Sequence, residues 1–224
     1  MCIRDSPHST VNAHLSINLA NNEIHEESAS HIAEDLNRTS IVSTLWLGGN
    51  PIGDKALQTI FDALKQNNTL KCLNVAGCGM TNTGVASLAD VLHTNNTLVI
   101  VGIDRNLLGD RGIAFLSGAL KQNVTLKYLH VAKCGMTDIG VALLADALHT
   151  NNTLETLRIH GNDELTENGL AYLVEVLSRN SGLVELVLPR HSRSSVDKVE
   201  KTINEARKRN GLATIKVMGK YCER

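Results

Sequence analysis

Aromatic residues and prolines are scarce in this sequence, and long hydrophobic runs are absent. Its 224 residues include two phenylalanines, three tyrosines, one tryptophan and three prolines, so a core has to be built from leucine, isoleucine, valine and alanine. No apolar run approaches the roughly 18 residues that span a bilayer, and the beginning of the chain lacks a signal-peptide pattern. We therefore expect a soluble, cytoplasmic protein.

Neither sign of charge is in clear excess. The 22 Lys and Arg against 23 Asp and Glu give a formal net charge of −1, so no overall field attracts nucleic acid or an anionic membrane. Residues 183–224 are the exception, with a net charge of +5. We interpret this end as a solvated helix that closes the fold, and contact with an acidic partner is the alternative. The lack of interleaved aromatic residues argues against a nucleic-acid platform there.

Familiar catalytic motifs are missing as well. The sequence has no G-x-x-x-x-G-K-[ST] phosphate loop, no H-E-x-x-H and no G-x-S-x-G. Its five cysteines form no C-x-x-C pair, which disfavours a zinc site or a disulfide framework. We therefore predict no enzymatic activity, no catalytic residue, no metal or cofactor, and no small-molecule substrate.

What the sequence has instead is an internal repeat of 28 residues. Residues 70–97 and 126–153 are identical at 21 of 28 positions, and residues 98–125 keep the same pattern with different letters. Such a period indicates a solenoid, in which neighbouring repeats share one continuous core. With a 29-residue step before each of the last two, the frame predicts the strand cores Ile17/Leu19, Leu45/Leu47, Leu73/Val75, Val101/Ile103, Leu129/Val131, Leu157/Ile159, Leu186/Leu188 and Ile215/Val217.

Each repeat changes its period partway through. Its opening, L-x-x-L-x-L, alternates apolar and polar residues like a half-buried strand, and the apolar residues that follow, such as Val85, Leu88 and Leu92, have helical spacing. A small residue recurs where this helix begins, which we attribute to close packing of the helix against the strand layer. These small residues are Ser28, Ala56, Gly84, Gly112, Gly140 and Gly169.

The ninth position of the repeat carries asparagine or cysteine. An asparagine amide can satisfy unpaired backbone groups in the turn after the strand, so we predict a ladder along the stack. Cysteine takes this position in alternate repeats as a compact, buried, weakly hydrogen-bonding group, too far from the next cysteine for a disulfide. The predicted structural ladder is Asn22, Asn50, Cys78, Asn106, Cys134 and Asn162.

The frame L-x-x-L-x-L-x-x-N/C, followed by G-x-x-x-L-A-x-x-L, resembles the ribonuclease-inhibitor class of leucine-rich repeats over about residues 14–218. The resemblance implies an α/β horseshoe-shaped solenoid, with a parallel sheet on the concave side and helices on the convex side, that serves as a protein-binding scaffold. The last repeats look most like those of NOD-like receptors, which implies a ligand-sensing role in innate immunity. A Ran-type GTPase-activating protein, whose family ends in an acidic tail, and a tropomodulin-like actin-binding domain are the alternatives.

The two ends of the chain are interpreted separately. Residues 1–13 lie outside the repeat frame, and their first six, MCIRDS, resemble translated sequencing adapter. Residues 14–224 form one leucine-rich repeat domain of about seven to eight repeats. We expect the chain to be the C-terminal part of a longer protein whose upstream part carries any catalytic or nucleotide-binding domain.

Five N-x-[ST] sequons occur, and four of them share one position, where a helix ends and the next strand begins. We explain these four asparagines by the left-handed conformation that closes a helix, and not by glycosylation. They are Asn67, Asn95, Asn123 and Asn151.

Strand residues that point away from the shared core should line the concave face. Trp46, the one tryptophan, lies between two inward leucines and therefore points outward. Trp, Tyr and Arg are the residue types that most often anchor interfaces. We predict that a protein partner, and neither nucleic acid nor a membrane, binds this face through Trp46, Asn74, Asp104, Arg105, Tyr128, His130, Lys133, Arg158 and His160.

Overall fold

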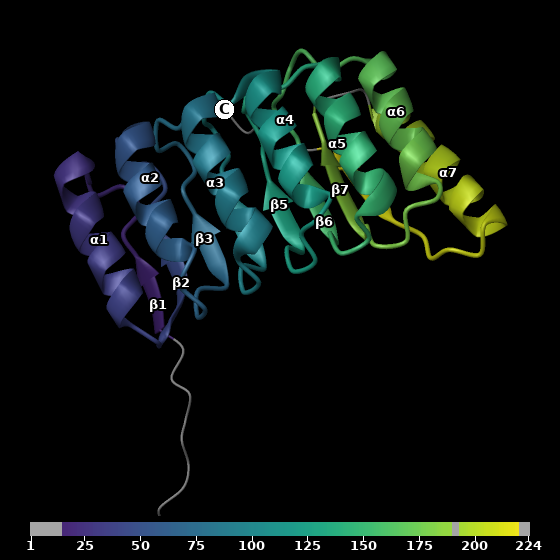
Figure 1. Ribbon diagram of the computed structural model, residues 1–224. Helices are drawn as coiled ribbons and strands as arrows, with labels where there is room; N and C mark the ends of the chain where they lie inside the picture. Colours follow the sequence, from purple (N-terminus) through teal and green to yellow (C-terminus); the bar gives the residue numbers. More distant parts are fainter. Residues whose placement is uncertain (1–14, 190–192, 220–224) are drawn as a thin grey trace, which may run out of the picture.

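Strands and helices alternate along the whole described chain, which comprises residues 15–189 and 193–219 of the computed structural model (Figure 1). The predicted separation of residues 1–13 from the repeats lies outside the described residues. The strands are β1 (Leu15–Asn18), β2 (Val42–Trp46), β3 (Cys72–Asn74), β4 (Ile100–Gly102), β5 (Tyr128–His130), β6 (Thr156–Arg158), β7 (Glu185–Leu188) and β8 (Lys216–Gly219). The helices are α1 (Glu26–Arg38), α2 (Gly53–Leu64), α3 (Asn82–Thr94), α4 (Gly109–Leu120), α5 (Asp138–Thr150), α6 (Glu167–Leu177) and α7 (Arg193–Arg209).

The strands form a single parallel sheet in sequence order, from β1 to β8. Each helix connects one strand to the next, and Figure 1 shows the helices side by side in a layer that covers one face of the sheet. The layers curve together into an arc with the helices on its outer side. The predicted α/β solenoid, with a parallel sheet and an outer layer of helices, is confirmed.

The core runs without interruption between the sheet and the helices. Leu45, Leu73 and Val101 are paired across β2, β3 and β4, each 28 residues from the last, as the repeat frame requires. These inward residues are buried, and so are Leu88 and Leu92 on the facing side of α3. Because each repeat lends one apolar stripe to its neighbours, the core is a property of the stack.

The last strand departs from the predicted register. Leu186 pairs with Val217, and not with Ile215, so the final step of the repeat is two residues longer than expected. A two-residue shift keeps every side chain on its own face, because side chains alternate with a period of two. Ile215 and Val217 are accordingly both buried, while Lys216 between them is exposed.

The explanation given for the small residues at the helix starts was wrong. A Cβ atom on Gly84 would overlap the Asp54 carboxylate and the Met80 side chain, and no strand atom is among its nearest neighbours. Asp54 lies in the first turn of α2, where its oxygens accept hydrogen bonds from the backbone N–H (2.7 Å) and hydroxyl (2.6 Å) of Thr81, the residue that caps α3. Gly84 therefore leaves room for a contact between neighbouring helices.

Candidate partner-binding surface

Asparagine side chains join neighbouring repeats along the rim where the strands end. The amide of Asn106 donates to the carbonyls of Val75 and Ile103, both at 2.9 Å. Its oxygen accepts from the backbone N–H groups of Cys78 (3.1 Å) and Met80 (3.0 Å). One side chain thus satisfies four buried backbone groups in two repeats, and Asn50 and Asn162 have the same set of contacts.

Cysteines occupy the same rim between these asparagines. The thiol of Cys78 donates to the Leu47 carbonyl (3.2 Å), and that of Cys134 donates to the Ile103 carbonyl (3.4 Å). Burial raises the pKa of the Cys78 thiol to about 11 and that of Cys134 to about 12, so both stay protonated at neutral pH. Asn22 differs from the rest of the predicted set, because its side chain is exposed and donates to Ala20 within its own repeat.

A second asparagine ladder, missed by the sequence reading, runs along the opposite rim. Asn95 has φ −76° and ψ 127°, which is extended and not left-handed, so the explanation given for the sequon asparagines was wrong. Its amide donates to the carbonyls of Leu64 and Asn67, and its oxygen accepts from the N–H groups of Thr97 and Leu98, all at 2.9 Å. The recurrence of N-x-T at one repeat position was the signal that could have revealed this ladder. Its members are Asn67, Asn95, Asn123, Asn151 and Asn180.

Arg207 completes the second ladder at its C-terminal end. Its side chain is almost fully buried in α7, and its Nη1 donates to the carbonyls of Leu177 and Asn180 while Nε donates to Ala213. Leu177 is the last residue of α6, where the negative end of the helix dipole favours a cation. The basic C-terminal helix is therefore not solvated throughout.

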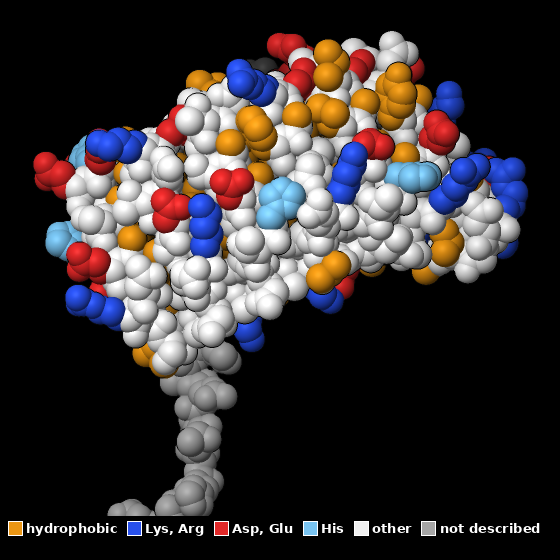
Figure 2. Space-filling view, viewed as in Figure 1, with side chains coloured by type: hydrophobic (Ala, Val, Ile, Leu, Met, Phe, Trp, Pro, Cys, Tyr) orange, Lys and Arg blue, Asp and Glu red, His pale blue; other side chains and the backbone are white. Residues whose placement is uncertain are grey.

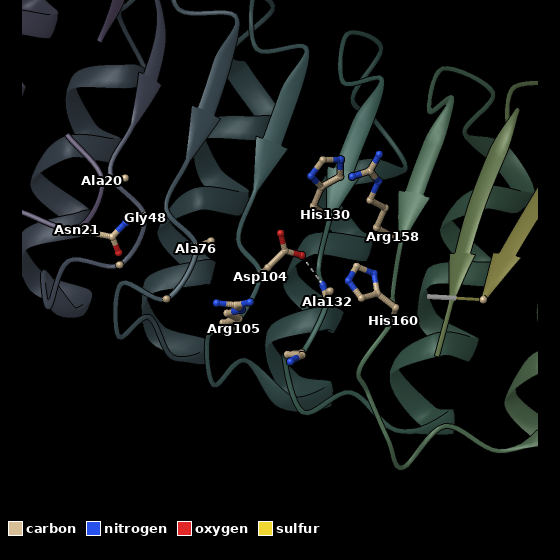
Figure 3. A pocket seen from close by; sticks show the side chains of 14 residues that line it. Ala20, Asn21, Gly48, Ala76, Asp104, Arg105, His130, Ala132, Arg158 and His160 are labelled. Atoms are coloured by element: carbon tan, nitrogen blue, oxygen red, sulfur yellow. Dashed lines mark hydrogen bonds between the residues drawn. The ribbon is translucent and has the colours of Figure 1, made fainter. Parts of the chain in front are cut away.

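The concave face carries a groove of about 880 Å³ (Figure 3). From the predicted partner-binding set it brings together Asp104, Arg105, His130, Lys133, Arg158 and His160. Trp46, Asn74 and Tyr128 do not line the groove. Trp46 and Asn74 lie in the cross-strand row that continues to His130 and Arg158, and Trp46 is 45% exposed.

One half of the groove has almost no side chains in its floor. The residues lining it toward β1 include Ala20, Gly48, Gly49, Ala76 and Gly77, and Figure 3 shows the open space that they leave beside the longer side chains from β4 onward. These floor residues were not part of the predicted site. The signal for them was the lack of a side chain at matching repeat positions.

The other half of the groove is polar and mostly cationic. One oxygen of Asp104 accepts the Ala132 backbone N–H at 2.7 Å, and the Arg158 guanidinium lies 3.5 Å from the Glu185 carboxylate. Arg105 and Lys133 are exposed, and no salt bridge to either is found in the described part of the chain.

Arg105 and Lys133 also have an unusual backbone conformation. Their φ angles are 57° and 54°, in the left-handed region. The matching position of other repeats holds asparagine or glycine: Asn21, Gly49, Gly77 and Gly161. A long side chain at such a position costs on the order of 1 kcal/mol relative to glycine. Two neighbouring repeats thus carry strained cations on the same stretch of the groove.

The convex face has its own exposed apolar patch. Figure 2 shows apolar side chains gathered over α4, α5 and α6, and the exposed apolar residues of these helices are Phe115, Ile139 and Tyr172. This patch is the main competitor of the groove as a contact surface.

Two kinds of site were searched for without result over residues 15–189 and 193–219. None of the helices in this part is both long and apolar enough to cross a membrane. No group of three or more His, Cys, Asp or Glu side chains in it is arranged to hold a metal ion.

The curved parallel sheet, its outer helices and the asparagine–cysteine rim define a leucine-rich repeat solenoid. A family model described as "Leucine Rich repeat" matches residues 66–89 and 122–145. The chain is similar in structure to the "Leiomodin-1 Actin-Binding Site 2 (ABS2)", with a TM-score of 0.51 and 16% identity over 81% of this chain and 92% of that one. It is also similar to the tropomodulin C-terminal domain of Caenorhabditis elegans, with a TM-score of 0.48 and 9% identity over 82% of this chain and 95% of that one. No curated protein matches the sequence. Likeness at such identities shows a shared fold and no more.

Proposed function

We propose that this protein is a non-catalytic scaffold that binds a protein partner on the concave face of its solenoid. The groove of about 880 Å³ supports this, because it joins an open floor to a wall of polar side chains from several repeats. Seven gaps between strands at ~4.8 Å give the sheet a width of roughly 34 Å, enough for a standard protein interface.

We further propose that the scaffold is the ligand-sensing or regulatory repeat region of a NOD-like receptor-type protein of the cytoplasm. The 28-residue repeat and its alternation of asparagine with cysteine support this assignment. A tropomodulin-like actin-binding domain is the second candidate, because leiomodin's actin-binding site 2 has the same fold. A Ran-type GTPase activator is the third, and the basic end of the chain disfavours it.

A photocrosslinking experiment tests the binding surface. Benzoylphenylalanine replaces Tyr128 on the concave face in one variant and Tyr172 on the convex face in the other, so both substitutions exchange one aromatic side chain for another. After irradiation in extract of the source cells, we expect a covalent protein adduct from position 128 alone. Adducts from position 172 alone would place the contact on the convex patch and contradict the proposal.

Two assays separate the candidate partners. An actin-binding domain should slow depolymerisation of actin filaments at substoichiometric amounts, and a GTPase activator should stimulate GTP hydrolysis by Ran at catalytic amounts. We expect neither effect from a NOD-like receptor-type scaffold. Stimulated GTP hydrolysis would sink the non-catalytic assignment.

A further inference from the structure

We propose that the concave groove takes an acidic segment of the protein partner, with its carboxylates held between Arg105 and Lys133. This inference rests on the proposed function and names the chemistry of the partner. Its starting point is the backbone conformation of these two residues, both left-handed, at a repeat position that other repeats fill with glycine or asparagine.

The position itself gains nothing from a long side chain. Gly49 and Gly77 adopt the same conformation without strain, so the fold does not require an arginine or a lysine there. Strained residues that the fold does not need are often found at ligand sites. Arg105 and Lys133 occupy this position in consecutive repeats, where Arg105 N donates to Ala132 O and Lys133 N to His160 O on the adjoining repeat.

The side chain of Lys133 is guided along the groove. A Cβ atom on Gly161 would overlap Cγ of Lys133, so the lysine stem lies over the glycine of the next repeat. Both cations are exposed, and neither has a carboxylate partner in the salt bridges of the described residues. They are therefore available to a carboxylate from another molecule.

The surrounding charges leave the wall cationic. Asp104 is the acidic group next to the pair, but one of its oxygens already accepts the Ala132 N–H. Glu185 lies beside Arg158, which itself lines the groove. Arg105, Lys133 and Arg158 thus outnumber the two carboxylates, so the wall complements negative charge.

The bare floor accounts for the shape of the occupant. Ala20, Gly48 and Ala76 present at most a methyl group, which allows a backbone to approach the sheet closely. From Ala20 to His160 the groove crosses five strand gaps, roughly 24 Å, so an extended segment of about eight residues fills it. We therefore infer an extended acidic segment and not a compact anion.

Binding of synthetic peptides tests the inference. Fluorescein-labelled peptides of about ten residues, alternating Glu with Ser, Gln with Ser or Lys with Ser, are titrated with the whole chain, and anisotropy is followed at low ionic strength. We expect the Glu peptide to bind and the other two not to. In the variant R105G/K133G its Kd should rise at least tenfold, while the midpoint of thermal unfolding stays the same or rises, because the strain is removed.

Matched variants exclude a mere charge or folding effect. R111Q/K208Q removes the same charge from exposed sites on α4 and α7, and its Kd should stay within twofold of wild type. R105N/K133N keeps a residue type that this backbone position accepts at Asn21, and its Kd should rise like that of the glycine variant. A glycine variant that binds as wild type does would overturn the inference. So would a lower unfolding midpoint in both R105G/K133G and R105N/K133N, which would mean a structural role for the two cations.

Other anions are tested in the same assay. Vesicles rich in phosphatidylserine, or polyuridylate, that bind as tightly as the Glu peptide and lose binding in R105G/K133G would overturn the assignment to a protein segment. Photocrosslinking at position 128 separates this inference from the proposed function. Concave crosslinks without Glu-peptide binding would refute the acidic segment alone, whereas Glu-peptide binding with crosslinks from position 172 alone would refute the concave scaffold alone.

Discussion

The two rims of the sheet solve the same problem with different residues. On the rim where strands end, asparagine alternates with cysteine, and each Asn106-type amide serves backbone groups of two repeats. On the opposite rim an asparagine stands in every repeat from Asn67 to Asn180. At that rim each oxygen serves the turn of its own repeat, as Asn95 does for Thr97 and Leu98, so no neighbour can take over. The difference teaches that alternation is possible only where one side chain reaches backward along the stack.

The largest effect should come from removing an asparagine of the alternating rim. Asn106→Leu leaves two carbonyls and two N–H groups buried without partners, at about 1–3 kcal/mol each, so we expect a loss of about 4 kcal/mol or more. Asn95→Leu on the other rim should cost a similar amount. Urea unfolding measures both. A loss below about 1 kcal/mol for either would mean that the corresponding ladder is replaceable.

Arg207→Met should follow, with a loss of about 3 kcal/mol. The methionine fills part of the volume, but three backbone carbonyls lose a donor. Lys208→Met on the exposed side of the same helix is the control and should change the free energy of unfolding by less than about 0.5 kcal/mol. Equal effects from the two variants would contradict a special role for the end of the second ladder.

Cys78 distinguishes polarity from volume on the alternating rim. We expect Cys78→Ser to cost less than about 1 kcal/mol, because a hydroxyl can donate to the Leu47 carbonyl as the thiol does. Cys78→Leu should cost about 2 kcal/mol, since it is larger and leaves that carbonyl unpaired. Urea melts that show the same loss for both would rule out a hydrogen-bonding role for this position.

High pH should weaken the alternating rim and not the other one. Folding raises the pKa of Cys78 from an ordinary 9.0 to about 11, so this thiol's stabilisation is complete below pH 9 and is lost as the pH rises toward 11. The slope is about 1.4 kcal/mol per pH unit for each such thiol. The unfolding free energy should therefore fall more steeply from pH 9 to 11 in wild type than in Cys78→Ser/Cys134→Ser. Parallel curves would show that both thiols ionise as freely in the folded chain.

Trp46 should give the smallest effect on stability. Because its indole is exposed on the concave face, Trp46→Ala should change the unfolding free energy by no more than ~0.5 kcal/mol, whereas Leu47→Ala, at a buried neighbour, should cost roughly 2–5 kcal/mol. Acrylamide should quench the single tryptophan readily. Weak quenching would mean that the strand presents its opposite face.

The repeat frame could be predicted because two independent periods agree on it, the alternation of the strand and the 3.6-residue period of the helix. The register of β8 could not, because Ile215 and Val217 are both apolar and either one can align with Leu186 while keeping the same face inward. The concave position of Trp46 followed from its inward neighbours alone. Which concave residues share a groove did not follow, since that depends on the missing side chains at Gly48 and Ala76.

Contacts between repeats were the other gap in the prediction. The sequence shows Asp54 and Thr81 as separate helix-start residues, and only the stack places them in one hydrogen-bonded pair. The burial of Arg207 was missed for a similar reason. Its basic neighbours predict a solvated helix, and the carbonyls that it meets belong to the preceding helix and its turn.

The alternating rim implies that this protein grows by pairs of repeats. Cys78 and Cys134 each depend on the asparagine one repeat further along to satisfy their backbone N–H, so a duplicated single repeat would place two cysteines or two asparagines side by side. A duplicated pair of 56 residues keeps every partner. The 21 identities between residues 70–97 and 126–153, which exceed the likeness of either to the repeat between them, are what such an event leaves behind. Natural length variants of this chain should therefore differ by multiples of two repeats, an outcome that transcripts from the same gene can show directly.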